Sequence, residues 1–360
     1  MNQSTLDNSP STIQSKCTGC GADMKFHIET GGIVCSHCGS QQTFDDTEQV
    51  QRRKLCDDLI KGHAKWDGSA VFQCSNCGAK EVLEDKKLAR QCAFCGAAQV
   101  IQINELPGIK PDSVIPFSIT EDAAVARFRK WIKSRWFAPS NLKRDDVREK
   151  MHKIYTPCWS FSANTLNQYS GTLGRTVTRT VGVGKNQRTQ TTTEWFNVRG
   201  TFPQSYTDIF FQSGERINNV NFTRLKPFDL KQVKVFRNEY LSGIIAEHYT
   251  RNLEQCLGDF SNFIKRDINQ SIIRKYRADS TRHLNIHTTY NDRRFNYVLL
   301  PIYISNYYYR GKLFNFYVNG ATGKVTGRHP KSLVKIWGLV FGIVALVVGA
   351  AIGLHFAGIV

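Results

Sequence analysis

Eight cysteines near the start of the chain fall into four CxxC pairs that form an internal repeat. The first repeat consists of Cys17, Cys20, Cys35 and Cys38, and the second of Cys74, Cys77, Cys92 and Cys95. In each repeat 14 residues separate the two pairs. Zinc binds four ligands at the corners of a tetrahedron, and CxxC pairs joined by a hairpin supply thiolates in that arrangement. The spacing therefore predicts two zinc ribbons, each with a structural Zn²⁺ ion and no position left for water.

A glycine follows every CxxC pair and supports the same prediction. These glycines are Gly21, Gly39, Gly78 and Gly96. Glycine adopts positive φ angles, so the chain can turn and point backbone N–H groups at the thiolates. Gly31 and Gly32 predict a hairpin turn inside the first spacer.

The remaining cysteines and two nearby histidines have simpler interpretations. A thioredoxin-like redox dithiol would need a βαβ context, which this region lacks, so the zinc interpretation is favoured. His27 and His37 are interpreted as bystanders and not as ligands. Cys56, Cys158 and Cys256 have no partner motif and are predicted to be small buried apolar residues.

The C-terminal segment predicts a membrane span. Residues 336–354 contain no charged side chain, and a helix of this length is about long enough to cross a hydrocarbon core of ~30 Å. Arg328, Lys331 and Lys335 precede the span, and the positive-inside rule then places the preceding domains in the cytoplasm, at the inner membrane. The first 30 residues contain no apolar run that would indicate a signal peptide, which agrees with cysteines kept in a reducing cytosol.

A row of small residues within the span predicts self-association of the helix. It consists of Gly338, Gly342, Ala345, Gly349 and Gly353. Small residues at four-residue spacing let two membrane helices approach closely, which would form a homodimer. Glycine and alanine are also common in membrane helices that make no such contact, so both interpretations stay open.

The net charge of +18 is distributed unevenly along the chain. Residues 1–105 hold 11 Lys and Arg against 13 Asp and Glu, a net charge of −2, and the remainder carries +20. Such a basic region favours contact with anionic membrane lipid or with nucleic acid. The candidate contacts for an anionic surface are Arg175, Arg179, Lys185 and Arg188 on a predicted hairpin. An ordinary solvated surface is the alternative.

These patterns divide the chain into six segments. They are a disordered tail (1–15), a first zinc ribbon (16–45), a connecting helix (46–66), a second zinc ribbon (67–104), a basic α+β domain (105–332) and a transmembrane tail anchor (333–360). The fold class is therefore a multidomain chain with two small zinc ribbons, an α+β cytoplasmic domain and one C-terminal transmembrane helix.

Patterns within the α+β domain predict its elements. Ser118 and Glu121 match a capping box at the start of a helix. Residues 171–200 alternate in the manner of a β-hairpin. Residues 230–279 are predicted to be mostly helical, and residues 284–326 to be rich in strands.

Motifs for catalysis are lacking. Residues 320–325 resemble a phosphate-binding loop, but the first glycine is too close and Val325 replaces the required Ser or Thr. Residues 182–185 fail in a similar way. The sequence has no HExxH and no GxSxG motif, so the protein is predicted not to be an enzyme.

The two CxxCG ribbons and several later segments resemble one family. The later segments are residues 155–161, 193–195, 227–230, 240–243, 300–303 and 316–325. Together they are similar to the bacterial TFIIB-type zinc-ribbon membrane proteins, a group that includes YdjG-like proteins. Some members are named primosomal helicases, but this chain lacks the ATPase motifs such a name requires. The resemblance implies a link to phage-shock-type membrane-stress systems with PspA, SPFH or TPM-domain partners, and it implies no catalytic residues.

Two functions from different classes follow. The first is a membrane-anchored zinc-ribbon adaptor that docks protein partners at the inner leaflet. The alternative is a membrane-tethered regulator that binds nucleic acid. Nucleic-acid affinity depends on phosphate neutralisation, whereas the ribbon region is net acidic and four thiolates around one Zn²⁺ add about −2 per site. The charge distribution therefore favours the adaptor.

Overall fold

The structure, a computed structural model, covers most of the chain from the first cysteine to the C-terminal helix. It describes residues 15–44, 48–55, 70–74, 80–83, 100–103, 109–144, 151–182, 187–228, 230–242 and 244–356. Of these, residues 70–74, 80–83, 100–103, 144, 230 and 351–356 are described by their backbone alone. The predicted disordered tail lies almost entirely outside the described residues.

The first CxxC repeat folds into a small antiparallel sheet of four strands in the order β1-β2-β3-β4. Its strands are β1 (Ser15–Lys16), β2 (Asp23–His27), β3 (Gly32–Cys35) and β4 (Gln41–Gln42). The turn between β2 and β3 contains Gly31 with a φ of +64°, which confirms the predicted hairpin. We call residues 15–44 the four-cysteine module.

The rest of the described chain is built on one large, mostly antiparallel sheet. Three long strands form its centre, namely β10 (Met151–Val181), β11 (Arg188–Gln212) and β14 (Ser280–Tyr309), in the order β11-β10-β14. The shorter strands are β5 (Arg53–Lys54), β6 (Ala70–Cys74), β7 (Lys80–Leu83), β8 (Val100–Ile103), β9 (Ser113–Val114), β12 (Lys234–Val235), β13 (Ile245–Glu247), β15 (Lys312–Asn319) and β16 (Val325–Gly327). The described body is therefore mostly β, with less helix than the predicted α+β domain.

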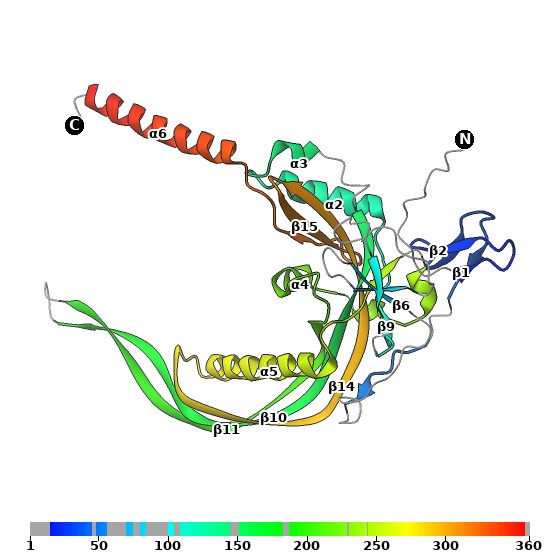
Figure 1. Cartoon of the computed structure of the whole chain (residues 1–360). Coiled ribbons are helices and arrows are strands. Elements are labelled where there is room, and N and C mark those ends of the chain that lie inside the picture. The colour runs from blue at the N-terminus through cyan, green and yellow to red at the C-terminus, as the bar shows by residue number, and fades with distance from the viewer. Residues whose placement is uncertain are drawn as a thin grey trace.

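The long strands leave the body as a curved arm (Figure 1). We define the arm as residues 162–181, 188–208 and 280–294. The predicted hairpin over residues 171–200 is confirmed, but it is only the outer part of a pairing that runs from Cys158 and Gln212 to the tip. Helix α5 (Leu253–Lys275) lies along the concave side of the arm (Figure 1).

The apolar stripe of α5 explains why it lies against the arm. Its buried residues are Leu253, Cys256, Phe260, Ile264, Ile268 and Ile272. This spacing places them on one face of a helix. Phe260 stacks on Phe161 of β10 with ring centroids 5.3 Å apart, and Tyr206 of β11 donates a hydrogen bond to Asp267 (2.9 Å).

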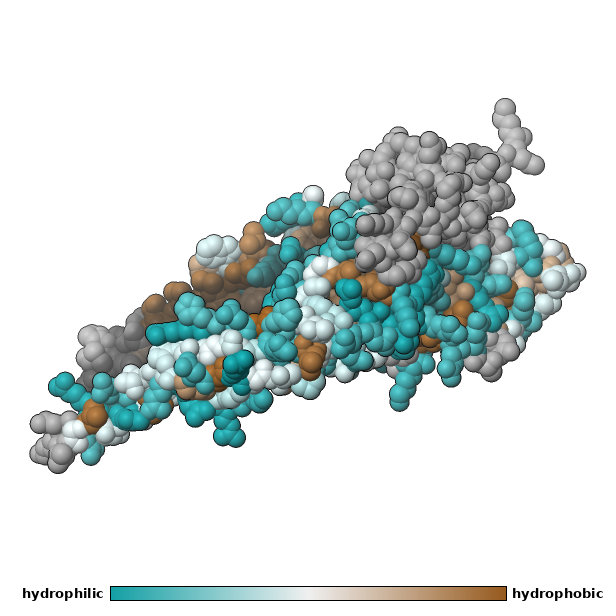
Figure 2. All heavy atoms as spheres, turned by 90° about the horizontal axis from the view of Figure 1, so that it is seen from below, coloured by the Kyte–Doolittle hydropathy of each residue, from teal (hydrophilic) through white to brown (hydrophobic). Residues whose placement is uncertain are grey.

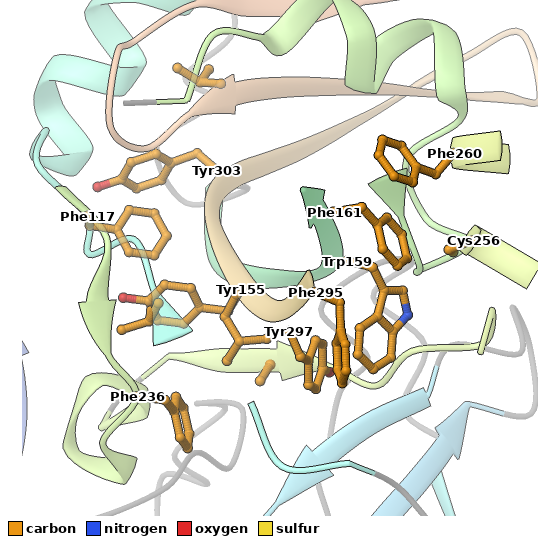
Figure 3. Close-up of a cluster of buried hydrophobic side chains, with 14 of the residues drawn as sticks. Phe117, Tyr155, Trp159, Phe161, Phe236, Cys256, Phe260, Phe295, Tyr297 and Tyr303 are labelled. Atoms are coloured by element: carbon orange, nitrogen blue, oxygen red, sulfur yellow. The ribbon is translucent and has the colours of Figure 1, made fainter. Parts of the chain in front are cut away.

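Both faces of the central sheet are covered inside the body. On one face the aromatic side chains of β10 and β14 pack with α2 (Glu121–Lys133) and α5, as in Figure 3, where Phe117, Tyr155 and Tyr303 gather at one end and Phe161 and Phe260 at the other. On the opposite face Cys158 and Ile302 pack with α4 (Asn219–Leu225). Two-sided burial explains the continuous apolar run of residues 297–304, since strands covered on both faces lose the polar alternation.

Three short elements and the C-terminal helix complete the described fold. They are α3 (Ser140–Arg144), two 3₁₀ turns at Leu230–Gln232 and Asn238–Leu241, and α6 (Leu333–Phe356). The prediction that residues 284–326 are rich in strands is confirmed, since they form most of β14 and all of β15, together with β16. Residues 230–279 are helical mainly within α5, and the preceding part forms the 3₁₀ turns, β12 and β13.

The start of α2 differs from the predicted capping box. The N-cap residue is Thr120, whose side chain accepts a hydrogen bond from the N–H of Ala123 (3.3 Å). The hydroxyl of Ser118 instead contacts the side chain of Gln232 (3.1 Å). The predicted boundary was wrong by two residues, because tertiary contacts hold Ser118 in an extended segment whose N–H donates to Gly320.

The predicted connecting helix over residues 46–66 is wrong where the structure describes it. Residues 48–55 contain no helix and include β5, which pairs with β14. Arg52 donates to the buried carboxylate of Asp208 (2.8 Å), and Arg53 forms an ion pair with Asp112. These tertiary partners outweigh the weak local helix propensity. Residues 56–66 lie outside the described part of the chain.

Candidate metal centre and membrane helix

The fold of the four-cysteine module brings its two CxxC pairs together. One pair follows β1 and the other begins at the end of β3, and the β2–β3 pairing aligns Met24 with Cys35. All four ligand sulfurs lie within 4.8 Å of one another. The sulfurs of Cys17 and Cys38 are 3.6 Å apart, and those of Cys20 and Cys35 are 3.5 Å apart. A tetrahedral site with metal–sulfur bonds near ~2.3 Å needs sulfur separations of about 3.8 Å, so these residues fit one metal ion.

The two CxxC turns have the same backbone geometry. Gly21 donates to the carbonyl of Cys17 (2.9 Å), and Gly39 donates to the carbonyl of Cys35 (3.1 Å). Both glycines have a φ of +73°, a conformation that costs glycine no steric penalty. The structure therefore explains why glycine follows each pair: without it the turn that directs backbone N–H groups at the sulfurs would be strained.

Hydrogen bonds to the sulfurs shape the acidity of this cluster. The N–H groups of Cys20 and Gly19 lower the pKa of Cys17. The hydroxyl and N–H of Ser40 lower the pKa of Cys38 to about 6. For Cys20 the N–H of Ala22 favours the thiolate, but contacts with the neighbouring thiols prevail and raise the pKa to about 12. Thiols this close compete for protons, and binding of a divalent cation replaces those protons.

The four-cysteine module is packed onto the body through aromatic side chains. Phe26 and Phe44 contact the ring of Tyr240, with centroids 5.5 and 5.0 Å apart. The N–H of Phe26 donates to the carbonyl of Ser242 (3.0 Å). Within the module the first cysteine of each pair is buried and the second is exposed. One edge of the sulfur cluster thus faces outward, and the module keeps a defined position on the body.

The second CxxC repeat lies largely outside the described residues. Cys77, Cys92 and Cys95 are among the residues not described, and only the backbone of Cys74 is described, at the end of β6. The strands around this repeat do not form a separate sheet like that of the four-cysteine module. Instead β6 pairs with β7 and β8, and β7 pairs with β13, so that they extend the large sheet.

The other two described cysteines, Cys158 and Cys256, are fully buried, as predicted. Burial raises the pKa of both thiols, to about 11 for Cys256. They pack as small apolar residues. Cys56 lies outside the described part of the chain.

Helix α6 is long and apolar enough to cross a membrane, and it is the one such helix in the described part of the chain. Its 24 residues would extend ~36 Å at 1.5 Å per residue, against a hydrocarbon core of ~30 Å. None of the span Leu333–Ala350 is buried. Figure 2 shows a brown apolar surface behind the arm, where α6 lies, whereas the arm is mainly teal and white.

The predicted flanking cations lie at the root of α6. Lys335 donates from Nζ to the carbonyl of Ala138 (2.7 Å), while Arg328 and Lys331 are exposed. The small residues of the predicted self-association face all lie in α6, and a Cβ added to Gly338, Gly342 or Gly349 would meet nothing within 4 Å.

The predicted anionic-surface residues are only partly free. Arg175 donates to the carbonyls of Tyr276 (2.7 Å) and Arg277 (3.3 Å) just after α5. Arg179 forms an exposed ion pair with Glu194. Arg188 is exposed, and Lys185 lies outside the described residues.

Sequence reasoning missed a basic and aromatic segment beside α6. Lys133, Trp136 and Lys143 line a groove together with residues of α6. Trp136 is 72% exposed, which is unusual for so large an aromatic side chain. The signal available in the sequence was the run Lys133-Ser134-Arg135-Trp136 directly after a predicted helix, since basic residues beside tryptophan are typical of membrane interfaces.

These features define a class of protein: a mostly β body that carries a four-cysteine module and one exposed apolar C-terminal helix. The chain is 31% identical over 329 residues to the uncharacterized protein YdjG of Bacillus subtilis (strain 168), and the match covers 90% of this chain and 92% of that protein. The chain therefore belongs to the YdjG family. No family model matches the chain, and no solved structure matches it.

Proposed function

We propose that the protein is a membrane-anchored adaptor without catalytic activity. Its α6 helix would span the membrane, and its zinc-bound cysteine modules and β body would dock protein partners. The observation that carries this proposal is the placement of the two ends: α6 projects from the side of the body opposite the four-cysteine module (Figure 1). A helix anchored in lipid would then hold the module away from the membrane and accessible to partners.

Zinc is the metal that best suits the four-cysteine module. Thiolate sulfur is a soft ligand, and sets of four cysteines at tetrahedral spacing are typical of structural Zn²⁺ sites. The residues that would hold the ion are Cys17, Cys20, Cys35 and Cys38. With four protein ligands no open position remains for a substrate or water, which supports a structural role. The second repeat would hold another Zn²⁺ ion by the same spacing.

The orientation we propose places the four-cysteine module and the body in the cytoplasm. Basic residues flank membrane helices on the cytoplasmic side, and Arg328, Lys331 and Lys335 precede the apolar part of α6. Partners of the membrane-stress type, as the family resemblance implies, would be reached at the inner leaflet.

Nucleic-acid binding is less well supported than protein docking. Two arginines of the arm are candidates to contact phosphate. Arg175 donates to carbonyl groups just after α5, and Arg179 is paired with Glu194. Arg175 keeps its charge beside the carbonyls but offers phosphate only its remaining N–H groups. Arg179 would have to give up its exposed ion pair with Glu194, which costs ~1 kcal/mol or less.

The test is affinity capture of the full-length protein from membranes, followed by mass spectrometry. Wild type is compared with Cys35→Ser, which removes a buried ligand, and with His37→Ala, which changes the same loop but no ligand. We expect wild type and His37→Ala to capture the same membrane-associated proteins and Cys35→Ser to lose them. Recovery of nucleic acid instead of protein, or an unchanged set of proteins with Cys35→Ser, would contradict the adaptor.

A further inference from the structure

A groove of about 710 Å³ runs between the root of α6 and the segment that joins α2 to α3. In Figure 1, α6 leaves the body beside α3. Three lysines and Trp136 belong to its lining near the first turn of α6, where Lys335 contacts the carbonyls of Trp136 and Ala138. The glycine and aliphatic residues that line it follow further along α6. The groove therefore has a cationic end and an apolar end.

The cationic end is built from residues far apart in the sequence. Lys133, Lys143 and Lys335 line it, and none of the described residues that line the groove is acidic. Lys143 donates from Nζ to the carbonyl of Lys133 (3.3 Å), and Lys335 donates to the carbonyl of Ala138 (2.7 Å). These contacts fix the ammonium groups of Lys143 and Lys335 without neutralising their charge, and the charge of Lys335 acts on Lys143.

Among the described residues, the charges that act on the titratable groups of this cluster are all positive. Burial, followed by the nearby charge of Lys335, lowers the pKa of Lys143. Burial also lowers the pKa of His329, and the charges of Arg135, Lys331 and Lys143 lower it further. Several cations thus repel one another around the root of α6, and a bound anion would relieve that repulsion.

The apolar end offers room for a hydrocarbon chain. Gly338 and Gly342 leave space in which an added Cβ meets nothing within 4 Å. Leu339, Ile343 and Leu346 line the same side and are exposed by 44, 52 and 76%. Apolar side chains of this kind are stable in contact with lipid and costly in contact with water.

The length of the groove matches one leaflet of a bilayer. Lys335 and Leu346 are eleven residues apart in α6, a rise of about 16 Å, and half of a hydrocarbon core is about 15 Å. Trp136 lies level with the cationic end, where aromatic side chains of membrane proteins meet the headgroups.

We propose that this groove binds one anionic phospholipid, with its phosphate between Lys133, Lys143 and Lys335 and an acyl chain over Gly338 and Gly342. The inference rests on the proposed membrane span of α6 and adds to it a specific lipid site. The bound lipid would fix the angle between α6 and the body, because it contacts α2, α3 and α6 together.

The first test measures lipid bound to the full-length protein in an uncharged detergent by native mass spectrometry. The added lipids are phosphatidylglycerol, which is anionic, and phosphatidylcholine, which has no net charge. Lys133→Gln with Lys143→Gln should weaken phosphatidylglycerol binding by about tenfold or more. The matched control is Lys265→Gln with Arg266→Gln, which removes the same charge from exposed positions on α5, and it should bind like wild type. Equal losses in both double variants, or no loss in either, would overturn the proposal.

A second pair of variants tests the apolar end without changing charge. Gly342→Leu fills the groove and should displace the lipid, whereas Gly349→Leu adds the same bulk to an open position that does not line the groove. A different outcome would overturn the lipid site. If wild type forms a dimer without bound lipid, and this dimer persists in the double lysine variant but is lost in Gly342→Leu, then a second copy of α6 occupies the groove.

Membrane fractionation separates this inference from the anchor itself. The double lysine variant should stay in the membrane fraction because α6 is intact. Wild type that is membrane-bound but does not prefer phosphatidylglycerol would overturn the lipid site and leave the anchor standing. Wild type found in the soluble fraction would overturn both.

Discussion

Cys35 lies in the buried half of the four-cysteine module, with its sulfur 3.5 Å from that of Cys20. Cys35→Ser leaves three thiolates, which are too few for a structural zinc site. Full-length wild type should contain two zinc ions per chain and the variant one, because the second repeat supplies its own ligands. Elemental analysis measures this, with His37→Ala as the unchanged control. Freshly reduced wild type that contains no zinc would contradict the prediction.

Glu247, at the end of β13, is a buried carboxyl group whose protonation state should affect stability. It is 3% exposed, and its Oε1 accepts hydrogen bonds from the N–H groups of Glu215 (3.1 Å) and Arg216 (3.2 Å). Its Oε2 has no partner among the described residues. Burial raises the pKa of this carboxyl from 4.5 to about 7.

Stability should therefore fall as this carboxyl ionises. The pKa of Glu247 is higher in the folded state than in the unfolded state. Its contribution to the free energy of unfolding is therefore complete below pH ~4.5 and is lost as the pH rises to about 7. The loss is on the order of 3 kcal/mol. Glu247→Gln keeps the acceptor oxygen but cannot ionise, so its unfolding temperature should exceed that of wild type at pH 8 and equal it at pH 4. The control is Glu29→Gln, at an exposed position whose charge is not among those that act on Glu247. A difference in unfolding temperature between Glu247→Gln and wild type that does not change with pH would refute this account.

At the scale of elements, the start of α2 distinguishes two N-cap assignments. The structure assigns Thr120, whose hydroxyl accepts from the N–H of Ala123, whereas the sequence pattern favoured Ser118. Thr120→Ala should lower the free energy of unfolding by about 1 kcal/mol. Ser118→Ala should cost clearly less, since its hydroxyl makes only exposed contacts, with the side chain of Gln232 and the carbonyl of Pro116. Chemical denaturation measures both, and the opposite ranking would return the N-cap to Ser118.

For the whole molecule, the distribution of charge and the apolar α6 predict how a truncated chain behaves. A chain that ends at Lys331 lacks α6 and should move to the soluble fraction. Its basic surface should bind anionic vesicles more strongly than neutral ones at near-physiological salt, because each well-placed cation contributes on the order of 1 kcal/mol at an anionic surface.

The same truncated chain separates lipid binding from nucleic-acid binding. Duplex DNA should bind weakly and without sequence preference, as it does to any polycation, and excess anionic vesicles should displace it. DNA that resists displacement, or one sequence preferred by about tenfold or more, would favour the tethered regulator over the adaptor.

The sequence by itself determined the features that depend on neighbouring residues. Four cysteines within 22 positions and a glycine after each pair are sufficient to form the sulfur cluster, because a CxxC turn and a short hairpin are local structures. The apolar run of α6 and the alternation in the outer arm are equally local, since they follow from the periodicity of one element.

Only the tertiary structure decided the features that join distant residues. The part of the predicted connecting helix that the structure describes, residues 48–55, contains β5 and no helix because Asp208 and Asp112 pair with its arginines, and no periodicity encodes such partners. The burial of Glu247 and the groove that joins Lys143 to Lys335 have the same origin. Packing between elements selects among locally acceptable conformations, so these sites become visible only once β10 and β14 have brought the elements of the body together.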